Sequence, residues 1–132
     1  MILIDSSAWI EYLRHTGSAI DRGIGDLIDA EADVAVTDVV SLELLSGVSE
    51  EERAGTLHQF LLRFTHLRTH APGDYEVAAA INRVCRRGGR TPRSRLDCLI
   101  AAVALRHDVE VLHRDRDFDL IARHTPLRVH QV

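Results

Sequence analysis

The chain has 132 residues, a mass of 14.8 kDa and 45% apolar residues, which suits one domain with a single core over residues 1–132. Charged residues make up 27%, the net charge is −4, and Gly and Pro are few, so disordered and fibrous proteins are excluded. No apolar run reaches the roughly 18 residues that span a bilayer, and no basic segment precedes the apolar N-terminus, so we expect neither a transmembrane segment nor a signal peptide.

The first half of the chain alternates between short apolar runs and segments with helical spacing of apolar residues. Met1 to Ile4 is an unbroken apolar run, which predicts a strand buried on both faces, and Asp5-Ser6-Ser7 can cap a following helix. The elements expected next are a helix through Trp9, Ile10 and Leu13, a helix over 20–28, a strand at 34–36, a helix from Thr37 or Asp38 to Gly47, a helix over 57–64 and a strand near 66–69.

The second half continues the same alternation. The expected elements are a helix from Asp74 to about Arg87, a break at 88–92, a helix through Leu96, Leu99 and Val103, a strand at 109–112, a helix over 117–123 and a strand at 127–129. Strands that alternate with helices predict an α/β fold with a parallel sheet covered on both faces. The GxGxxG fingerprint is absent, so this sheet need not hold a dinucleotide.

Three acids follow predicted strands. Asp5 comes after the first strand, and Asp115 and Asp117 come after the strand at 109–112. Ligands of parallel sheets bind beyond the carboxyl ends of the strands, so these acids are expected at one common edge.

Two further acids lie on predicted helices among apolar neighbours. Glu43 is flanked by leucines, and Asp97 lies in the first turn of its helix beside Leu96 and Leu99. A carboxylate near a buried face is costly unless it is paired or bound to a metal, and no Lys is available as a partner. Oxygen ligands favour Mg²⁺ or Mn²⁺ over zinc, so the acids together suggest a divalent cation.

Each acid also has an ordinary explanation when it is taken alone. Asp5 can simply cap a helix, and Asp97 can complement a helix dipole. Glu43 faces solvent if its helix is rotated from the expected orientation. Asp115 and Asp117 belong to an Arg-Asp-Arg-Asp run, which can be an exposed, self-paired charge cluster.

Four motifs in order make the chain resemble the PIN-domain ribonucleases, specifically VapC-type toxins of VapBC toxin–antitoxin systems. The resemblance covers essentially the whole chain, and the four motifs are specific only in combination. They are Ile4-Asp5-Ser6-Ser7-Ala8-Trp9-Ile10, Ser41-Leu42-Glu43-Leu44-Leu45-Ser46-Gly47, Leu96-Asp97-Cys98-Leu99-Ile100-Ala101-Ala102 and His113-Arg114-Asp115-Arg116-Asp117-Phe118.

The resemblance implies a three-layer α/β/α fold with a short, mainly parallel sheet, and a Mg²⁺- or Mn²⁺-dependent endoribonuclease. It implies that Asp5, Glu43, Asp97 and Asp115 form the catalytic, metal-holding quartet. We expect Asp5 and Asp97 to be the principal ligands. Ser7 and Asp117 are accessory candidates, and His113 departs from the family, in which a small hydroxyl residue is commoner at that position.

The basic residues of the chain are all arginines and are unevenly distributed. Six of the 16 lie between Arg83 and Arg95, a segment that contains no acid. The rest of the chain has ten arginines and 20 acids, a net charge of −10. This segment precedes Asp97 directly, so Arg90, Arg93 and Arg95 are candidates for contacts with RNA phosphates. The alternative is an ordinary solvated loop.

The resemblance also implies partners: a VapB-type antitoxin, an RNA substrate, a homodimer and higher toxin–antitoxin assemblies, with no membrane. The two cysteines, Cys85 and Cys98, lie in no metal-ligand spacing and favour a reducing, cytoplasmic location.

Three other functions are compatible with part of the sequence. A haloacid-dehalogenase-type phosphatase needs a second Asp where Ser7 stands and a Lys that the chain lacks. A catalytically silent PIN-like interaction module is opposed by the four retained acids. A PIN nuclease of RNA processing shares the site, and the sequence does not separate it from a toxin.

Overall fold

The computed structural model describes all residues from 1 to 132, and a four-stranded parallel sheet lies at its centre. The strand order is β3-β2-β1-β4, and every neighbouring pair is parallel. β2 is buried along its whole length, and β1 and β4 are buried at their last two residues, as their apolar sequences predict. The strands are β1 (Ile2–Ile4), β2 (Val34–Thr37), β3 (Thr65–Leu67) and β4 (Glu110–Leu112).

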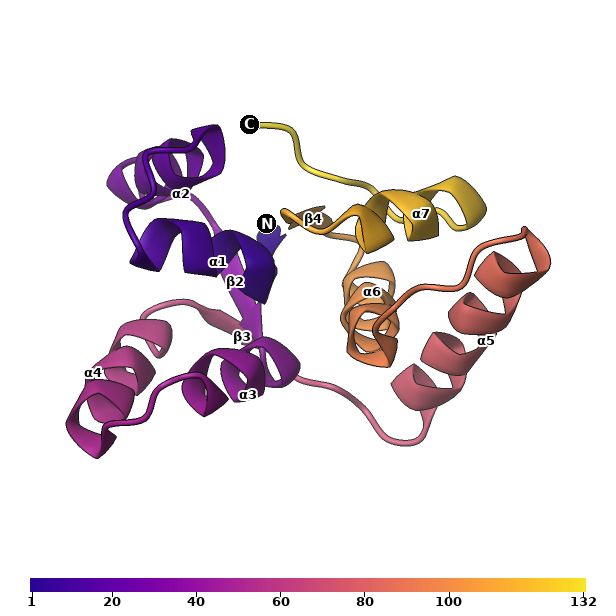
Figure 1. Ribbon diagram of the computed structural model, residues 1–132, viewed down its shortest axis with the longest axis horizontal. Helices are drawn as coiled ribbons and strands as arrows, with labels where there is room; N and C mark the ends of the chain where they lie inside the picture. Colours follow the sequence, from indigo (N-terminus) through magenta and orange to yellow (C-terminus); the bar gives the residue numbers. More distant parts are fainter.

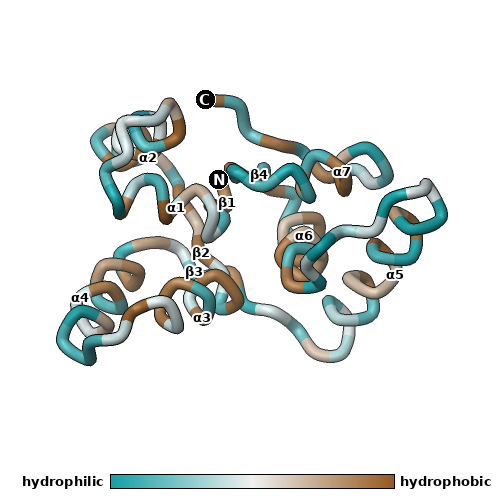
Figure 2. Tube along the Cα trace, viewed as in Figure 1, coloured by the Kyte–Doolittle hydropathy of each residue, from teal (hydrophilic) through white to brown (hydrophobic).

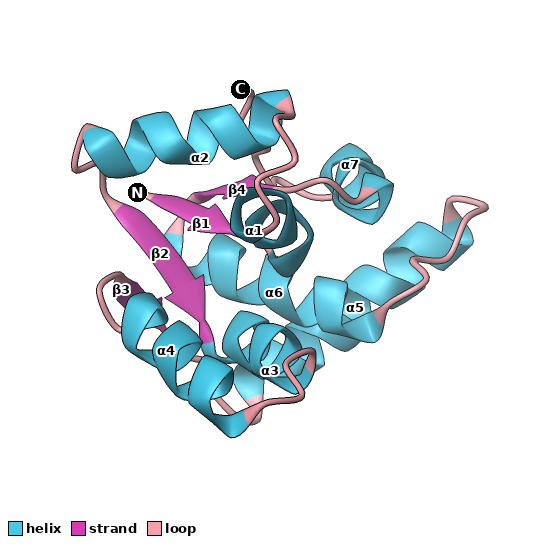
Figure 3. Cartoon of the chain, turned by 60° about the vertical axis from the view of Figure 1, so that its left-hand side comes forward, coloured by secondary structure: helices cyan, strands magenta, loops and turns pink.

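Seven helices connect and cover the strands. Figure 1 shows α1 to α4 on one side of the sheet and α5 to α7 on the other, and Figure 3 shows α6 lying behind the strands when the chain is turned. The three-layer α/β/α expectation is therefore confirmed. The helices are α1 (Ser6–Leu13), α2 (Ala19–Asp29), α3 (Asp38–Ser46), α4 (Glu51–Leu61), α5 (Gly73–Arg87), α6 (Arg95–His107) and α7 (Arg116–His124).

The core is a single cluster of 30 buried apolar residues. α6 carries much of it, since the run from Cys98 to Ala104 is buried on every side. In the opposite layer of helices, Trp9 is fully buried. The centroid of its ring lies 5.6 Å from the ring centroid of Phe60 and 5.2 Å from that of Phe64. The connection between α5 and α6, which contains the basic segment, is mainly hydrophilic (Figure 2).

The strand order creates a switch point between β1 and β4. From β1 the chain moves outward to β2 and β3, and it then returns through α5 and α6 to the other side of β1. Connections leave two neighbouring strands in opposite directions at such a point, which opens a crevice at their carboxyl ends. Asp5 follows β1 and Asp115 lies three residues after β4, so both acids arise at this crevice.

Two sequence predictions differ from the structure by more than two residues, while the other element bounds agree within about two residues. The strand expected at 127–129 is reduced to one parallel bridge between Val111 and Val129. The helix expected over 57–64 begins earlier, at Glu51, because its first turn is acidic and is stabilised by the helix dipole rather than by apolar packing. It ends at Leu61, although Phe64 still packs against Trp9.

No helix combines the length and the apolar character that a membrane crossing would require.

A buried ion pair joins the second layer of helices. Asp74 of α5 is 3% exposed and accepts hydrogen bonds from Nε and Nη2 of Arg106 on α6, both at 2.9 Å, and from the backbone N–H of His70 at 2.8 Å. Arg106 Nη2 also donates to the carbonyl oxygen of Arg68 at 2.7 Å. The Arg106 bonds and the backbone bond outweigh burial and lower the pKa of Asp74. The pair therefore fixes α5, α6 and the segment after β3 together.

We expect Asp74→Asn to lower the free energy of unfolding by about 2 kcal/mol, since it removes a charge-assisted bond and leaves a partly buried guanidinium without a counter-charge. Urea denaturation at neutral pH measures the change. Asp108→Asn is the matched control, because Asp108 pairs with Arg128 at a side chain that is 92% exposed and Asn tolerates its left-handed backbone equally well. Its change should stay below about 0.5 kcal/mol. If the two variants lowered the free energy of unfolding equally, the stabilising role of the Asp74–Arg106 pair would be contradicted.

Candidate active site

Asp5 begins the site at the carboxyl end of β1. It is the N-cap of α1 and only 1% exposed, and its Oδ2 accepts from the backbone N–H and the hydroxyl of Ser7, at 3.0 Å and 2.6 Å. The capping explanation is therefore correct, but it accounts for one oxygen only. Asp5 Oδ1 is buried with no hydrogen-bond partner. Burial raises the pKa of Asp5 against these bonds, and the charge of Asp115 raises it further.

Asp97 is a buried acid with a strongly raised pKa. It lies in the first turn of α6 and is 4% exposed, and its Oδ2 has no hydrogen-bond partner. Burial and then the negative charges of Asp5 and Asp115 raise its pKa to about 8. A helix-dipole role does not explain this burial, because a residue that only complements a dipole can remain in solvent.

Glu43 reaches the same place from α3. It is half-buried, and the hydroxyl of Ser6 donates to its Oε1 at 3.1 Å, which ties α3 to the start of α1. Burial is the main cause of its raised pKa, and the charge of Asp5 is the next. The helix is thus oriented with Glu43 toward the site, while its neighbour Leu42 is the exposed residue.

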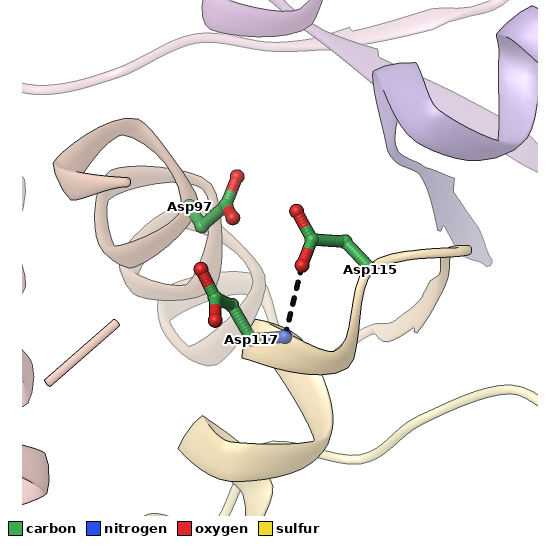
Figure 4. A group of neighbouring side chains, drawn as sticks. All are labelled: Asp97, Asp115 and Asp117. Carbon is green, nitrogen blue, oxygen red and sulfur yellow. Dashed lines mark hydrogen bonds between the residues drawn. The ribbon is translucent and has the colours of Figure 1, made fainter. Parts of the chain in front are cut away.

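Asp115 and Asp117 close the site at the start of α7. Asp115 is the N-cap of this helix, and its Oδ1 accepts from the backbone N–H of Asp117 at 2.9 Å. Oxygen atoms of Asp97, Asp115 and Asp117 all lie within 4.8 Å of one another. Figure 4 shows the three carboxylates converging from α6 and from the start of α7. We call the five residues Asp5, Glu43, Asp97, Asp115 and Asp117 the acidic cluster.

His113 supports the cluster from the chain just before Asp115. Its Nδ1 accepts from the backbone N–H of Asp115 at 2.9 Å, and its ring packs 5.2 Å from that of Phe118. An acceptor nitrogen carries no proton, so the other ring nitrogen of His113 holds the hydrogen. His113 therefore helps to orient the turn that carries Asp115.

Ser7 joins the two strand ends. Its hydroxyl donates to Asp5, as described above, and accepts from the backbone N–H of Arg114 at 2.9 Å. Both hydrogen-bonding functions of the hydroxyl are thus used within the protein. Ser7 connects the turn after β1 with the turn after β4, which is a positioning role.

The three candidate RNA-binding arginines are not equivalent. Arg93 contacts the acidic cluster: its backbone N–H donates to Asp117 Oδ2 at 2.8 Å, and its Nη2 donates to Asp115 Oδ1 at 3.2 Å. Arg90 is exposed and lines a hollow of about 180 Å³ with Arg93 and Asp117. Arg95 is exposed at the start of α6, without an ion pair. The sequence suggested both Arg93 and Asp117 but contained no signal of the bond between them.

The donor set of the cluster fits a divalent cation. All donors are carboxylate oxygens, and the two buried ones without partners, Asp5 Oδ1 and Asp97 Oδ2, belong to different elements. Unpaired buried carboxylate oxygens are costly, and a bound cation compensates for this cost where protein donors do not. Oxygen ligands suit hard cations such as Mg²⁺ and Mn²⁺.

Comparison with known proteins agrees with this architecture. The family model described as PIN domain matches residues 2–124. Two curated relatives, "Ribonuclease VapC11" of Mycobacterium tuberculosis and "VapC ribonuclease Mb1587" of Mycobacterium bovis, are each 43% identical to the chain over 129 residues. Those residues are 97% of this chain and 96% of each relative.

A solved structure of the VapBC-1 complex from nontypeable Haemophilus influenzae is also similar, and the match shows the same fold. It has a TM-score of 0.76 and 16% identity, and it covers 98% of this chain and 97% of that one. The family model and the relatives, which span nearly the whole sequence, carry the family assignment. The chain therefore belongs to the PIN domain family and, within it, to the VapC ribonucleases.

Proposed function

We propose that this protein is a metal-dependent endoribonuclease that acts as the toxin of a toxin–antitoxin pair. The observation that carries the proposal is the convergence of carboxylates from α1, α3, α6 and α7 at the switch point, with two buried oxygens lacking partners. The 43% identity to proteins named VapC ribonucleases supports the activity and the substrate class.

Asp5, Asp97, Glu43 and Asp115 would hold Mg²⁺ or Mn²⁺, with the buried oxygens of Asp5 and Asp97 as the principal ligands. When bound, the cation lowers the pKa of a water molecule and neutralises charge on the phosphate oxygens of the transition state. Ser6 occupies only Oε1 of Glu43, so Oε2 is available as a further ligand or as the acceptor of a proton from water. Ser7 holds the Asp5 carboxylate in one orientation by donating to its Oδ2.

The arginines from the end of α5 to the first turn of α6 would bind the RNA backbone. Arg90, Arg93 and Arg95 lie on the segment that leads into Asp97, so phosphates held there would be close to the acidic cluster. Contacts to phosphates position a nucleic acid without reading its sequence. This role makes cleavage weaken as ionic strength increases.

A VapB-type antitoxin is the partner we propose for the complete system. The solved structure of VapBC2 from Rickettsia felis, described as bound to a DNA fragment from its promoter, has a TM-score of 0.75 and 16% identity and covers 98% of each chain. By analogy, this chain would assemble as a homodimer with an antitoxin into a larger complex. The acidic body of the chain suits a basic antitoxin segment.

The test is incubation of total RNA with the purified, antitoxin-free protein in Mg²⁺ or Mn²⁺, in parallel with a chelator, followed by mapping of the new RNA ends. We expect discrete cuts that depend on the cation and that disappear with the chelator. Cuts that persist in the chelator would contradict the metal-dependent mechanism. Absence of cleavage by folded protein in either cation would favour a catalytically silent interaction module instead.

A further inference from the structure

Arg93 is the cation that directly contacts the acidic cluster. Its Nη2 lies 3.2 Å from Asp115 Oδ1, and its Nε lies 3.7 Å from Asp117 Oδ1. The other ion-paired arginines, 106, 114 and 128, pair with acids outside the cluster. Arg93 is therefore the arginine that forms ion pairs with the acidic cluster.

The backbone and the side chain of Arg93 are held with different strength. The backbone N–H donates to Asp117 Oδ2 at 2.8 Å, and the Asp117 side chain is only 7% exposed. A bond to a buried carboxylate is strong and protected from water. The guanidinium donates one hydrogen bond, to Asp115, and its other contact is the longer ion pair with Asp117. The Arg93 side chain is 64% exposed, where an ion pair contributes little. The position of the residue is thus fixed, while its charged group is free to exchange partners.

A divalent cation on the cluster and the guanidinium of Arg93 compete for the same carboxylate, that of Asp115. The guanidinium occupies Asp115 Oδ1, and a cation held by Asp115 would repel the nearby positive charge. Once displaced, the guanidinium remains beside the site because Asp117 still holds its backbone. A free guanidinium presents a planar fork of donors that matches the oxygens of a phosphate group.

We propose that Arg93 is an exchangeable counter-ion of the acidic cluster, positioned by Asp117, and that cation binding transfers its guanidinium from Asp115 to a phosphate of the RNA. The inference rests on the proposed function and deepens it. It assigns Asp117 the role of anchoring the arginine segment, and it makes binding of the cation a condition for full contact with the substrate.

The decisive measurement is calorimetric titration of metal-free protein with MnCl₂ at low ionic strength. Arg93→Gln keeps the backbone N–H and removes the competing charge, so we expect Mn²⁺ to bind about two- to fivefold more tightly than to the wild type. The matched control is Arg116→Gln, which removes an equal charge next to Asp115 at an exposed side chain that forms no ion pair. Its Mn²⁺ affinity should stay closer to that of the wild type than to that of Arg93→Gln.

The second readout is RNA cleavage, with KM for RNA measured at saturating Mn²⁺ and the Mn²⁺ requirement measured by titration of the cation. Arg93→Gln should raise KM for RNA while it lowers the Mn²⁺ concentration needed for half-maximal rate, a combination that simple loss of structure does not produce. Mn²⁺ affinity equal to or weaker than that of Arg116→Gln would overturn the inference, and so would an unchanged KM. A wild type that binds no Mn²⁺ would overturn the proposed function and this inference together, whereas Mn²⁺ binding unaffected by Arg93 overturns the inference alone.

Discussion

Replacing Asp97 by Asn is expected to reduce RNA cleavage by about a thousandfold or more while the protein stays folded, since loss of a cation-holding carboxylate removes several kcal/mol of transition-state stabilisation. Asp97 lies in the middle of the acidic cluster, and its Oδ2 is one of the two buried oxygens without a partner. Asn has nearly the same shape and removes one negative charge. Initial rates on a defined RNA at saturating Mn²⁺, together with circular dichroism, measure the two effects separately.

Asp26→Asn is the control for this substitution. Asp26 is exposed on α2 and forms no ion pair, so the same chemical change there should leave the rate within about twofold of the wild type, as expected for an unconstrained surface site. Retention of metal-dependent cleavage by Asp97→Asn would show that the cation is held elsewhere. It would therefore remove Asp97 from the proposed site.

The metal-free protein should lose stability as the pH rises from about 4 to about 8. The Asp97 pKa is raised from 3.8 to about 8, so within this range the unfolded chain releases a proton that the folded protein retains. Below pH 4 both states are protonated, and above pH 8 the folded state bears the full cost of the ionised group. The upper limit of the loss is about 6 kcal/mol, since the pKa of Asp97 is raised by about four units and each unit corresponds to about 1.4 kcal/mol. Urea denaturation at a series of pH values in chelator measures it.

Addition of Mn²⁺ should reverse most of this loss, because the cation binds the ionised cluster in the folded state and raises stability by mass action. Metal-free Asp97→Asn should show a shallower decline, and the part that remains comes from Asp5 and Glu43, whose pKa values burial also raises. Asp26→Asn should follow the wild type. Buried Asp74 acts in the opposite direction at the acid end, because its pKa is lowered and its ion pair with Arg106 is lost on protonation. A metal-free stability that is flat between pH 4 and 8 would contradict the buried, mutually repelling cluster.

Much of the fold follows from apolar periodicity. Met1 to Ile4 and Val34 to Val36 are short unbroken apolar runs, and both are strands in the structure. The strand expected at 127–129 failed because its apolar residues meet only the edge of β4, where a single bridge forms. Burial of Leu127 gives that segment an apolar pattern without ladder pairing. Periodicity reports which residues are buried, and it does not report which backbone groups find a partner.

The acidic cluster was predictable as a set of residues and not as a geometry. Asp5 and Asp115 could be brought together from the sequence because parallel strands end at a common edge. The depth of Asp97 and the link from Ser6 to Glu43 depend on how α1, α3 and α6 pack, which no local spacing specifies. The bond from Arg93 to Asp117 joins residues 24 positions apart across two segments, so only the folded chain reveals it.

Asp5 and Asp115 each perform two tasks, because each caps a helix and also contributes a carboxylate to the cluster. For variants designed to separate catalysis from folding, the choice of replacement at these positions decides what is learned. Ala removes the cap together with the charge, so lost activity and a weakened helix start become indistinguishable. Asn caps a helix about as well as Asp does and carries no charge. An inactive, fully folded form of this protein, suitable for trapping an RNA or a partner, is therefore best made with Asn.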